Sequence, residues 1–198
     1  MYGHHYRRIV GQRAHRTDCA TSTGQIQKNM PELKETKVTS ETKETPMNEY
    51  NRNPKNYDPR MHSAEHILIQ TMIRMFNCGR AFSSHIEKKK SKCDFHFTRN
   101  LAREEIVEID RRVNEVIQKD LPVIEEFLAR AEAATRFSLS RLPEEAGDTV
   151  RIISIGDYDA CPCSGPHALS SKEIGSFRVV STDYADGVLR VRYTIKQM

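Results

Sequence analysis

The sequence has no long apolar run. Its 198 residues contain nothing near the ~18 consecutive apolar residues that a membrane helix needs, and the first residues hold no apolar segment typical of a secretory signal. Cysteine is sparse as well. Five cysteines, an odd number and unevenly spread, do not fit the dense, paired framework of a small secreted domain. These absences predict a cytoplasmic protein with reduced thiols and no membrane partner.

Apolar residues are few relative to charged ones. The hydrophobic fraction is 37% and the charged fraction 29%, so we expect part of the chain to stay outside the core. We assign residues 1–55 to that part, as a disordered polar tail. Its segment "PELKETKVTSETKETP" cannot bury enough apolar surface to offset the entropy of ordering it. The net charge of +4 is compatible with an RNA partner without requiring one.

Residues 56–198 carry the periodic patterns of one folded domain. Helical spacing predicts one helix from Met61 to a stop at Gly79, and another after an N-cap at Asn100. A short strand at Val123 and Ile124 and a helix over about 128–135 are expected to follow. Further strands are predicted in "AFSSHIE", "KCDFHF", "TVRIISI" and the hairpin "SFRVVSTDYADGVLRVRYTIK". The order lacks regular strand–helix–strand alternation and predicts an α+β fold, with helices covering a mostly antiparallel sheet.

Histidine and cysteine occur in two clusters far apart in the sequence. His62 and His66 are spaced i, i+4, which places both imidazoles on one helix face within reach of one ion. Cys163 and His167 lie in a turn-rich segment, where a thiolate and an imidazole can converge; Cys161 is the rival thiolate. Together the two pairs offer the ligand types that zinc prefers. Each pair alone also fits a simpler interpretation, a polar helix stripe or a buried thiol beside an exposed histidine.

These clusters, with "SSKEIGSFRVVS" after the second, resemble the editing domain of alanyl-tRNA synthetase and the free-standing AlaX editing proteins. The threonyl-tRNA synthetase editing domain shares the pattern. "HSAEHIL" stands where the family has a histidine-rich helix start, and "PCSGPHALSSKEIG" where relatives have a "CGGTH" loop and a "GEIG" turn. The loop differs from that pattern at Ser164 and Pro166. The resemblance covers about 62–194 and implies that residues 56–198 form a second additional domain of the threonyl/alanyl-tRNA synthetase type, free-standing and without an aminoacylation core.

The resemblance implies a zinc-dependent trans-editing hydrolase, an aminoacyl-tRNA deacylase acting on the acceptor end of mischarged tRNA. Ser- or Gly-tRNA(Ala) is the first expectation and Ser-tRNA(Thr) the near alternative. The implied zinc ligands are His62, His66, Cys163 and His167, with His62 and His66 at the catalytic centre. A zinc ion with four protein ligands is usually a closed structural site. We therefore expect Cys163 or His167 to bind weakly or to be displaced by water or substrate. A structural zinc, a catalytically silent tRNA-binding module and a binder of free amino acids are the competing interpretations.

Substrate and RNA contacts are predicted from residue type. Ser83 and Ser84 carry hydroxyls that could bond the side chain of a mis-attached serine, although ordinary strand serines fit equally well. Six basic residues near the predicted hairpin and helix start are the candidates for binding the phosphates of the acceptor stem: Lys88, Lys89, Lys90, Lys92, Arg99 and Arg103. A solvated surface explains these residues too. No sequence-reading RNA motif is present, no DNA partner is expected, and the oligomeric state stays open.

Overall fold

The computed structural model describes residues 57–140, 142 and 147–196. Helices and strands alternate irregularly along this part of the chain. The predicted tail, residues 1–55, lies outside the described residues. The elements are, in order, α1 (Pro59–Phe76), β1 (Ser83–His85), β2 (Ser91–His96), α2 (Arg103–Gln118), β3 (Val123–Ala129), α3 (Arg130–Arg136), β4 (Thr149–Ile155), β5 (Asp159–Pro162), the 3-10 helix η2 (Ser171–Ile174), β6 (Ser176–Ala185) and β7 (Val188–Lys196).

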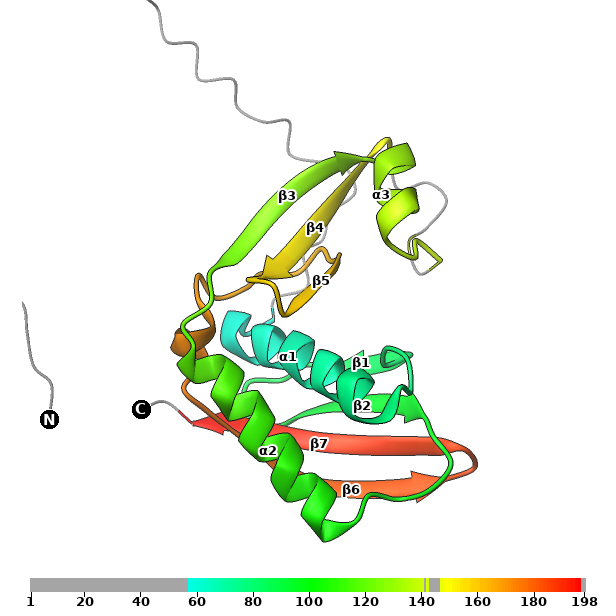
Figure 1. Cartoon of the computed structure of the whole chain (residues 1–198), viewed down its shortest axis with the longest axis vertical. Coiled ribbons are helices and arrows are strands. Elements are labelled where there is room, and N and C mark those ends of the chain that lie inside the picture. Colours follow the sequence, from blue (N-terminus) through cyan, green and yellow to red (C-terminus); the bar gives the residue numbers. More distant parts are fainter. Residues whose placement is uncertain (1–56, 141, 143–146, 197–198) are drawn as a thin grey trace, which may run out of the picture. The chain divides into compact units, whose positions relative to one another are not determined.

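The strands form two antiparallel sheets. One has the order β1-β2-β7-β6 and the other the order β3-β4-β5. Helix α1 contacts β2 and β7 of the first sheet and β5 of the second, so it lies between them, while α2 packs on α1 and β6 (Figure 1). The predicted α+β class is therefore confirmed, with two sheets where the sequence suggested one. All described helices fall short of the combined length and apolar character that a bilayer crossing demands.

Helix α1 begins and ends at residues that cap it. The Asp58 carboxylate accepts hydrogen bonds from the backbone N–H groups of Arg60 and Met61 at 3.0 and 3.2 Å, and Pro59 follows as the first helical residue. The helix stops at Asn77, whose left-handed backbone (φ 52°) directs its N–H to the Ile73 carbonyl. The stop predicted at Gly79 comes two residues too late, because asparagine also tolerates this conformation.

Helix α2 starts later than its sequence pattern suggests. Asn100 does not cap it; Ala102 precedes the first helical residue, and the Glu105 carboxylate accepts the Ala102 N–H at 2.8 Å. The predicted apolar face is buried at Ile109, Val113, Val116 and Ile117.

The segments after α2 show the largest departures from the predicted elements. The short strand at Val123 continues to Ala129 because it pairs along its length with β4, and α3 begins only at Arg130. Strand β5, residues Asp159–Pro162, is not among the predicted strands, yet it pairs with β4. The predicted hairpin is confirmed as β6 and β7, joined by Asp186 and Gly187 with φ values of 50° and 79°.

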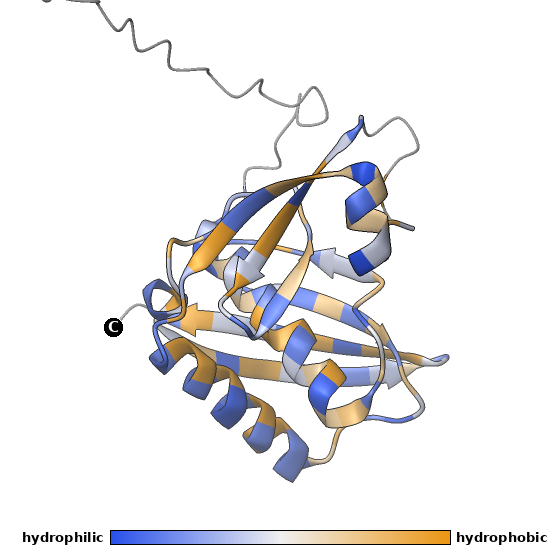
Figure 2. Cartoon of the chain, turned by 45° about the horizontal axis from the view of Figure 1, so that its top comes forward, coloured by the Kyte–Doolittle hydropathy of each residue, from blue (hydrophilic) through white to orange (hydrophobic). Residues whose placement is uncertain are grey.

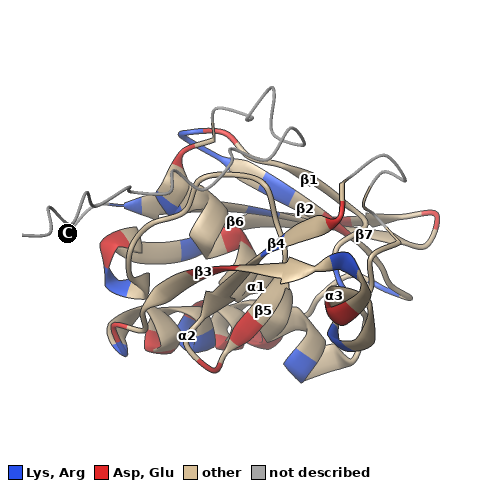
Figure 3. Cartoon of the chain, turned by 90° about the horizontal axis from the view of Figure 1, so that it is seen from above, with Lys and Arg blue, Asp and Glu red and all other residues tan. Residues whose placement is uncertain are grey.

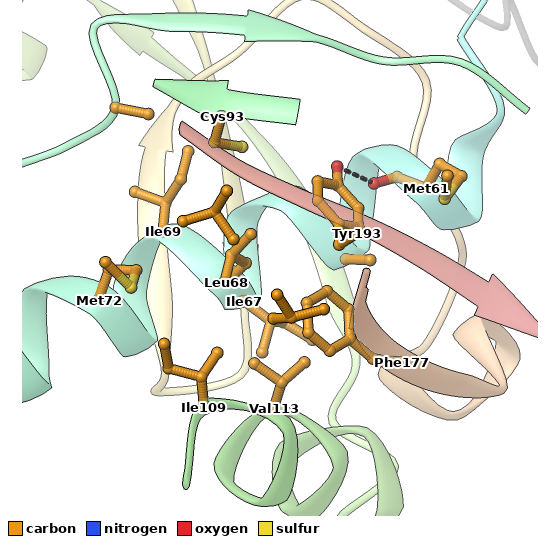
Figure 4. Close-up of a cluster of buried hydrophobic side chains, with 14 of the residues drawn as sticks. Met61, Ile67, Leu68, Ile69, Met72, Cys93, Ile109, Val113, Phe177 and Tyr193 are labelled. Atoms are coloured by element: carbon orange, nitrogen blue, oxygen red, sulfur yellow. Dashed lines mark hydrogen bonds between the residues drawn. The ribbon is translucent and has the colours of Figure 1, made fainter. Parts of the chain in front are cut away.

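The apolar residues separate into a large and a small cluster. The large cluster gathers α1, α2 and the inner face of the sheet β1-β2-β7-β6, and Figure 4 shows Ile67, Leu68 and Met72 of α1 among its members. Buried Tyr193 donates its hydroxyl hydrogen to the Met61 carbonyl at 3.1 Å, which ties β7 to the start of α1. The small cluster lies between the second sheet and α3. Along the strands, apolar residues alternate with polar ones, as the colours of Figure 2 show.

Candidate metal centre

The first turns of α1 and the segment after β5 meet at one place. The Sγ atom of Cys163 lies 3.3 Å from His62 Nε2 and 3.4 Å from His167 Nε2, and the rings of His62 and His167 stack with centroids 4.0 Å apart. The ring of His66 stands nearly perpendicular to that of His167, 4.6 Å away. One donor atom from each of these four residues lies within 4.8 Å of the others. The structure thus brings together all four predicted ligands.

Each histidine is oriented through its Nδ1 atom. His62 Nδ1 lies 3.0 Å from the Pro166 carbonyl oxygen, which can only accept, so this nitrogen donates. His66 Nδ1 lies 3.2 Å from the Asp159 carboxylate, and His167 Nδ1 lies 3.1 Å from the Ser63 hydroxyl. With Nδ1 occupied, the Nε2 atoms of these rings are left for a shared ligand. Backbone carbonyls and carboxylates orient metal-binding histidines in this way.

Asp159 is held by an arginine from the segment between α1 and β1. Arg80 donates to both carboxylate oxygens at 2.7 and 3.1 Å, and a nitrogen of the same guanidinium lies 3.2 Å from Cys161 Sγ. Burial acts to raise the pKa of Asp159, but the hydrogen bonds from His66 and Arg80 lower it to about 2. The carboxylate is therefore ionised and well placed to keep His66 in position.

Cys161 and Cys163 lie on different sides of His66. Cys161 is 3.6 Å from His66 Nδ1, beside Asp159 and the Arg80 guanidinium, so its donor atom belongs to a second group with His66 and Asp159. A cation there would meet the positive charge of Arg80, which disfavours metal binding. Cys163 instead shares a group with the three imidazoles, and the geometry selects it as the better thiolate ligand.

The titration states suit a metal centre. Burial would raise the pKa of Cys163, but contacts with His167, His62 and His66 lower it to about 2, so the sulfur is a thiolate at neutral pH. Burial, helped by the neighbouring His66 and His62, lowers the pKa of His167 to about 4, so that imidazole is neutral. Burial also acts to lower the pKa of His66, yet Cys161 and Asp159 raise it well above 6.5. A metal ion would have to displace that proton.

Gly165 lets the Cys163–His167 segment approach α1. A Cβ atom at this position would lie 2.4 Å from His62 Cε1 and 2.6 Å from His62 Nδ1, distances that real Cβ atoms essentially never show. Pro166, which lacks an N–H, loses nothing here because its carbonyl makes the contact with His62. Three imidazoles and one thiolate on a close-fitting scaffold could hold a metal ion.

The two candidate substrate residues point to opposite faces of the first sheet. Ser83 is paired with Asp94 and Ser84 with Cys93. Paired residues share a face and successive residues alternate. Buried Cys93 faces α1 in Figure 4, and the Ser84 hydroxyl lies 3.8 Å from its sulfur. Ser84 is therefore on the sheet face toward α1, and Ser83 is on the opposite face.

The six basic candidates do not gather in one patch. Lys88, Lys89 and Lys90 are exposed between β1 and β2, and Lys92 is half-buried on β2. Arg99 and Arg103 follow the far end of β2, so the whole strand, about 20 Å long, separates them from Lys88, Lys89 and Lys90. Arg99 is already bonded to Glu105 at 2.7 and 2.8 Å. Figure 3 shows basic and acidic residues interspersed over the described part of the chain, and an RNA-binding role of these residues stays a prediction.

Four residues at the site were not singled out from the sequence. Asp159 stands two positions before Cys161, but its role depended on β5, which the pattern did not predict. Arg80 has no local signal at all. Ser63 and Glu65 lie inside the "HSAEH" segment, and their polar side chains next to the helical histidine pair were the sequence signal that could have identified them.

Comparison with known proteins gives a consistent result. Residues 150–192, which include Cys163 and His167, match the family described as the threonyl and alanyl tRNA synthetase second additional domain. The alanine–tRNA ligase of Fervidobacterium nodosum is 33% identical over 134 residues, covering 67% of this chain and 16% of that protein. The enzyme of the same name from Methanopyrus kandleri is 32% identical over 139 residues, covering 68% and 15%. That of Lysinibacillus sphaericus is 32% identical over 132 residues, covering 66% and 14%. The chain spans about a sixth of the length of these relatives.

Proposed function

Because residues 150–192 match the threonyl and alanyl tRNA synthetase second additional domain family and the chain is similar to alanine–tRNA ligases, we propose that it is a zinc-dependent aminoacyl-tRNA deacylase. In this proposal it hydrolyses the ester that links a wrong amino acid to the 3′ end of tRNA. The observation that carries the proposal is the convergence of three imidazoles and one thiolate within 4.8 Å.

The donor set fits zinc better than magnesium or calcium. Imidazole and thiolate are ligands that zinc prefers, whereas magnesium and calcium take oxygen ligands. Zinc held by His62, His66, Cys163 and His167 would supply a Lewis acid that polarises an ester carbonyl and acidifies a water molecule. The chain itself keeps Cys163 ionised and His167 neutral at pH 7, and it orients His66 through Asp159.

The proposed substrate is tRNA(Ala) carrying serine or glycine. A synthetase pocket separates such small amino acids by only ~1–3 kcal/mol, so a second site that hydrolyses the errors is needed. Ser84, on the sheet face toward α1, is the candidate for bonding the serine hydroxyl. Ser-tRNA(Thr) is the alternative substrate within the same chemistry.

Purified zinc-loaded protein should be incubated with Ser-tRNA(Ala), Gly-tRNA(Ala), Ala-tRNA(Ala) and Ser-tRNA(Thr), and the remaining ester measured. We expect rapid loss of Ser-tRNA(Ala), slow loss of Ala-tRNA(Ala), and no hydrolysis by Cys163→Ala. Action on Ser-tRNA(Thr) alone would change the substrate and keep the chemistry. If protein with one zinc per chain hydrolyses none of the four, the proposed activity is wrong and a zinc-stabilised binding module replaces it.

A further inference from the structure

The helix that carries His62 and His66 also carries one acidic residue, Glu65. It lies three positions after the first histidine and one before the second, so the segment reads H-x-x-E-H. Glu65 is buried, with 7% of its surface exposed. Residues three and four apart share a helix face, so Glu65 and His66 each lie on the same side of α1 as His62. The same spacing in a class of zinc hydrolases combines two ligands with a proton-accepting glutamate.

The position of the carboxylate suits a proton acceptor better than a metal ligand. Its Oε2 atom lies 3.7 Å from His62 Nε2, the nitrogen that faces Cys163. It nevertheless lies outside the group of four donor atoms within 4.8 Å of one another. A carboxylate beside the donor set, and not in it, is within reach of a water molecule located at the site.

Glu65 also differs from the other buried carboxylates in its partners. Asp94 and Asp159 are each held by two hydrogen bonds from an arginine. Among the described residues, the ion pair of Glu65 is with His62. His62 already has an orienting partner in the Pro166 carbonyl, so it does not need Glu65 to hold its ring in place. Among the described residues, the Glu65 carboxylate thus lacks the pair of arginine hydrogen bonds that holds Asp94 and Asp159, although the Arg80 guanidinium interacts with it electrostatically.

We propose that Glu65 is the general base of the deacylation reaction, an inference that rests on the proposed function. The oxygen of a water molecule bonds to the acyl carbon of the ester while Glu65 takes a proton from that water. The bond between the acyl carbon and the ribose oxygen then breaks, its electron pair goes to the ribose oxygen, and Glu65 returns the proton to it. Free amino acid and uncharged tRNA are the products.

The test compares Glu65→Gln with Glu65→Asp and with Glu104→Gln, a control at an exposed glutamate of α2. Three quantities are measured: zinc per chain, affinity for tRNA(Ala) carrying serine through a non-hydrolysable 3′ amide, and the single-turnover rate on Ser-tRNA(Ala). Glu65→Gln should keep its zinc and its affinity for the amide while the rate falls by about 10²–10⁴-fold. Glu65→Asp should keep zinc with an intermediate rate, and Glu104→Gln should match the wild type.

The outcomes separate this inference from the proposed function. If the wild type hydrolyses no ester, the proposed function fails and the role of Glu65 falls with it. If the wild type is active and Glu65→Gln is equally active, only the role of Glu65 is overturned. Loss of zinc in Glu65→Gln would make Glu65 a ligand or a structural residue, which also overturns it. Should Glu65→Gln fail to fold, Glu65→Asp decides: full activity contradicts the proposal, and reduced activity with retained zinc supports it.

Discussion

The two sheets differ greatly in the apolar surface that supports them. The sheet β1-β2-β7-β6, with α1 and α2, supplies most of a cluster of 22 buried apolar residues among those described, to which the second sheet adds Ile155 of β4. The sheet β3-β4-β5 shares with α3 a cluster of four: Leu128, Ala133, Val150 and Ile152. Most of β3 is exposed, including Ile124 and Phe127. Since burial of apolar area is the main source of folding free energy, the second sheet should be the less stable.

The candidate metal centre joins these unequal regions. His62 and His66 come from α1, which is fixed in the large cluster, while Asp159, Cys163 and His167 come from β5 and the segment after it. An ion bound both by α1 and by the segment after β5 would connect the second sheet to the large cluster. It would therefore stabilise the second sheet more than the first, because few apolar contacts hold the second sheet in place.

The largest expected effect is loss of the ion. Cys163→Ala, or His62→Ala combined with His66→Ala, should reduce zinc from one per chain to none and abolish deacylation, because the four donors act together. Elemental analysis of protein purified without chelator measures this. Cys161→Ala is the matched control and should keep its zinc. An equal loss in both cysteine variants would show that Cys161 is a ligand.

Removal of zinc from the wild type should act unequally on the two sheets. With chelator present, amide hydrogens of β3, β4 and β5 should exchange faster, while those of β6 and β7 stay protected by the large cluster. Hydrogen exchange followed by mass spectrometry reports both sheets in one experiment. Uniform acceleration throughout would contradict the comparison.

Asp159→Asn should weaken zinc binding by about 10–100-fold, since the residue orients a ligand without binding the ion. It also leaves Arg80 without its carboxylate partner, which lowers the free energy of unfolding. Asp94→Asn, which breaks the pair with Arg190, is the control: it should lower stability without changing zinc affinity.

The stability difference between wild type and Asp159→Asn should also depend on pH. The folded pKa of Asp159, about 2, lies below its ordinary value near 3.8, so the carboxylate contributes stability above that ordinary value. The contribution is lost as the pH falls toward 2. Denaturant unfolding of zinc-free protein between pH 6 and pH 2 measures it, and a difference that grows on acidification would contradict the assignment.

Gly165→Ala should reduce zinc affinity more modestly, because the new methyl group would displace the His62 ring or the segment that carries Cys163. Gly79→Ala makes the same chemical change where nothing lies within 4 Å. It should cost about 1 kcal/mol of stability through its left-handed backbone and leave zinc binding unchanged. Competition with a chromogenic chelator compares the two variants, and equal affinities would argue against close packing at Gly165.

The smallest effect is expected from deleting residues 1–55, whose sequence lacks apolar periodicity. Melting temperature and deacylation rate should both stay near those of the full chain. A truncated protein that melts many degrees lower would show that this segment supports the domain.

The sequence by itself determined the features that depend on short-range geometry. The buried face of α2, the β6–β7 hairpin and the i, i+4 placement of His62 and His66 follow from the helix period and from turn residues, which neighbouring residues impose on one another. Even there, the ends of α1 and α2 were displaced by two or three residues, because capping depended on Asn77 and Glu105 and not on the stronger-looking Gly79 and Asn100.

The tertiary structure alone decided which side chains share a space. Strand β5 exists because β4 pairs with it, and that pairing places Asp159 beside His66 and within reach of Arg80, 79 positions earlier. The pairing of β1 with β2 likewise decided which of Ser83 and Ser84 faces α1. Contacts between distant segments depend on how whole sheets and helices pack, and no periodicity in a single segment encodes that packing.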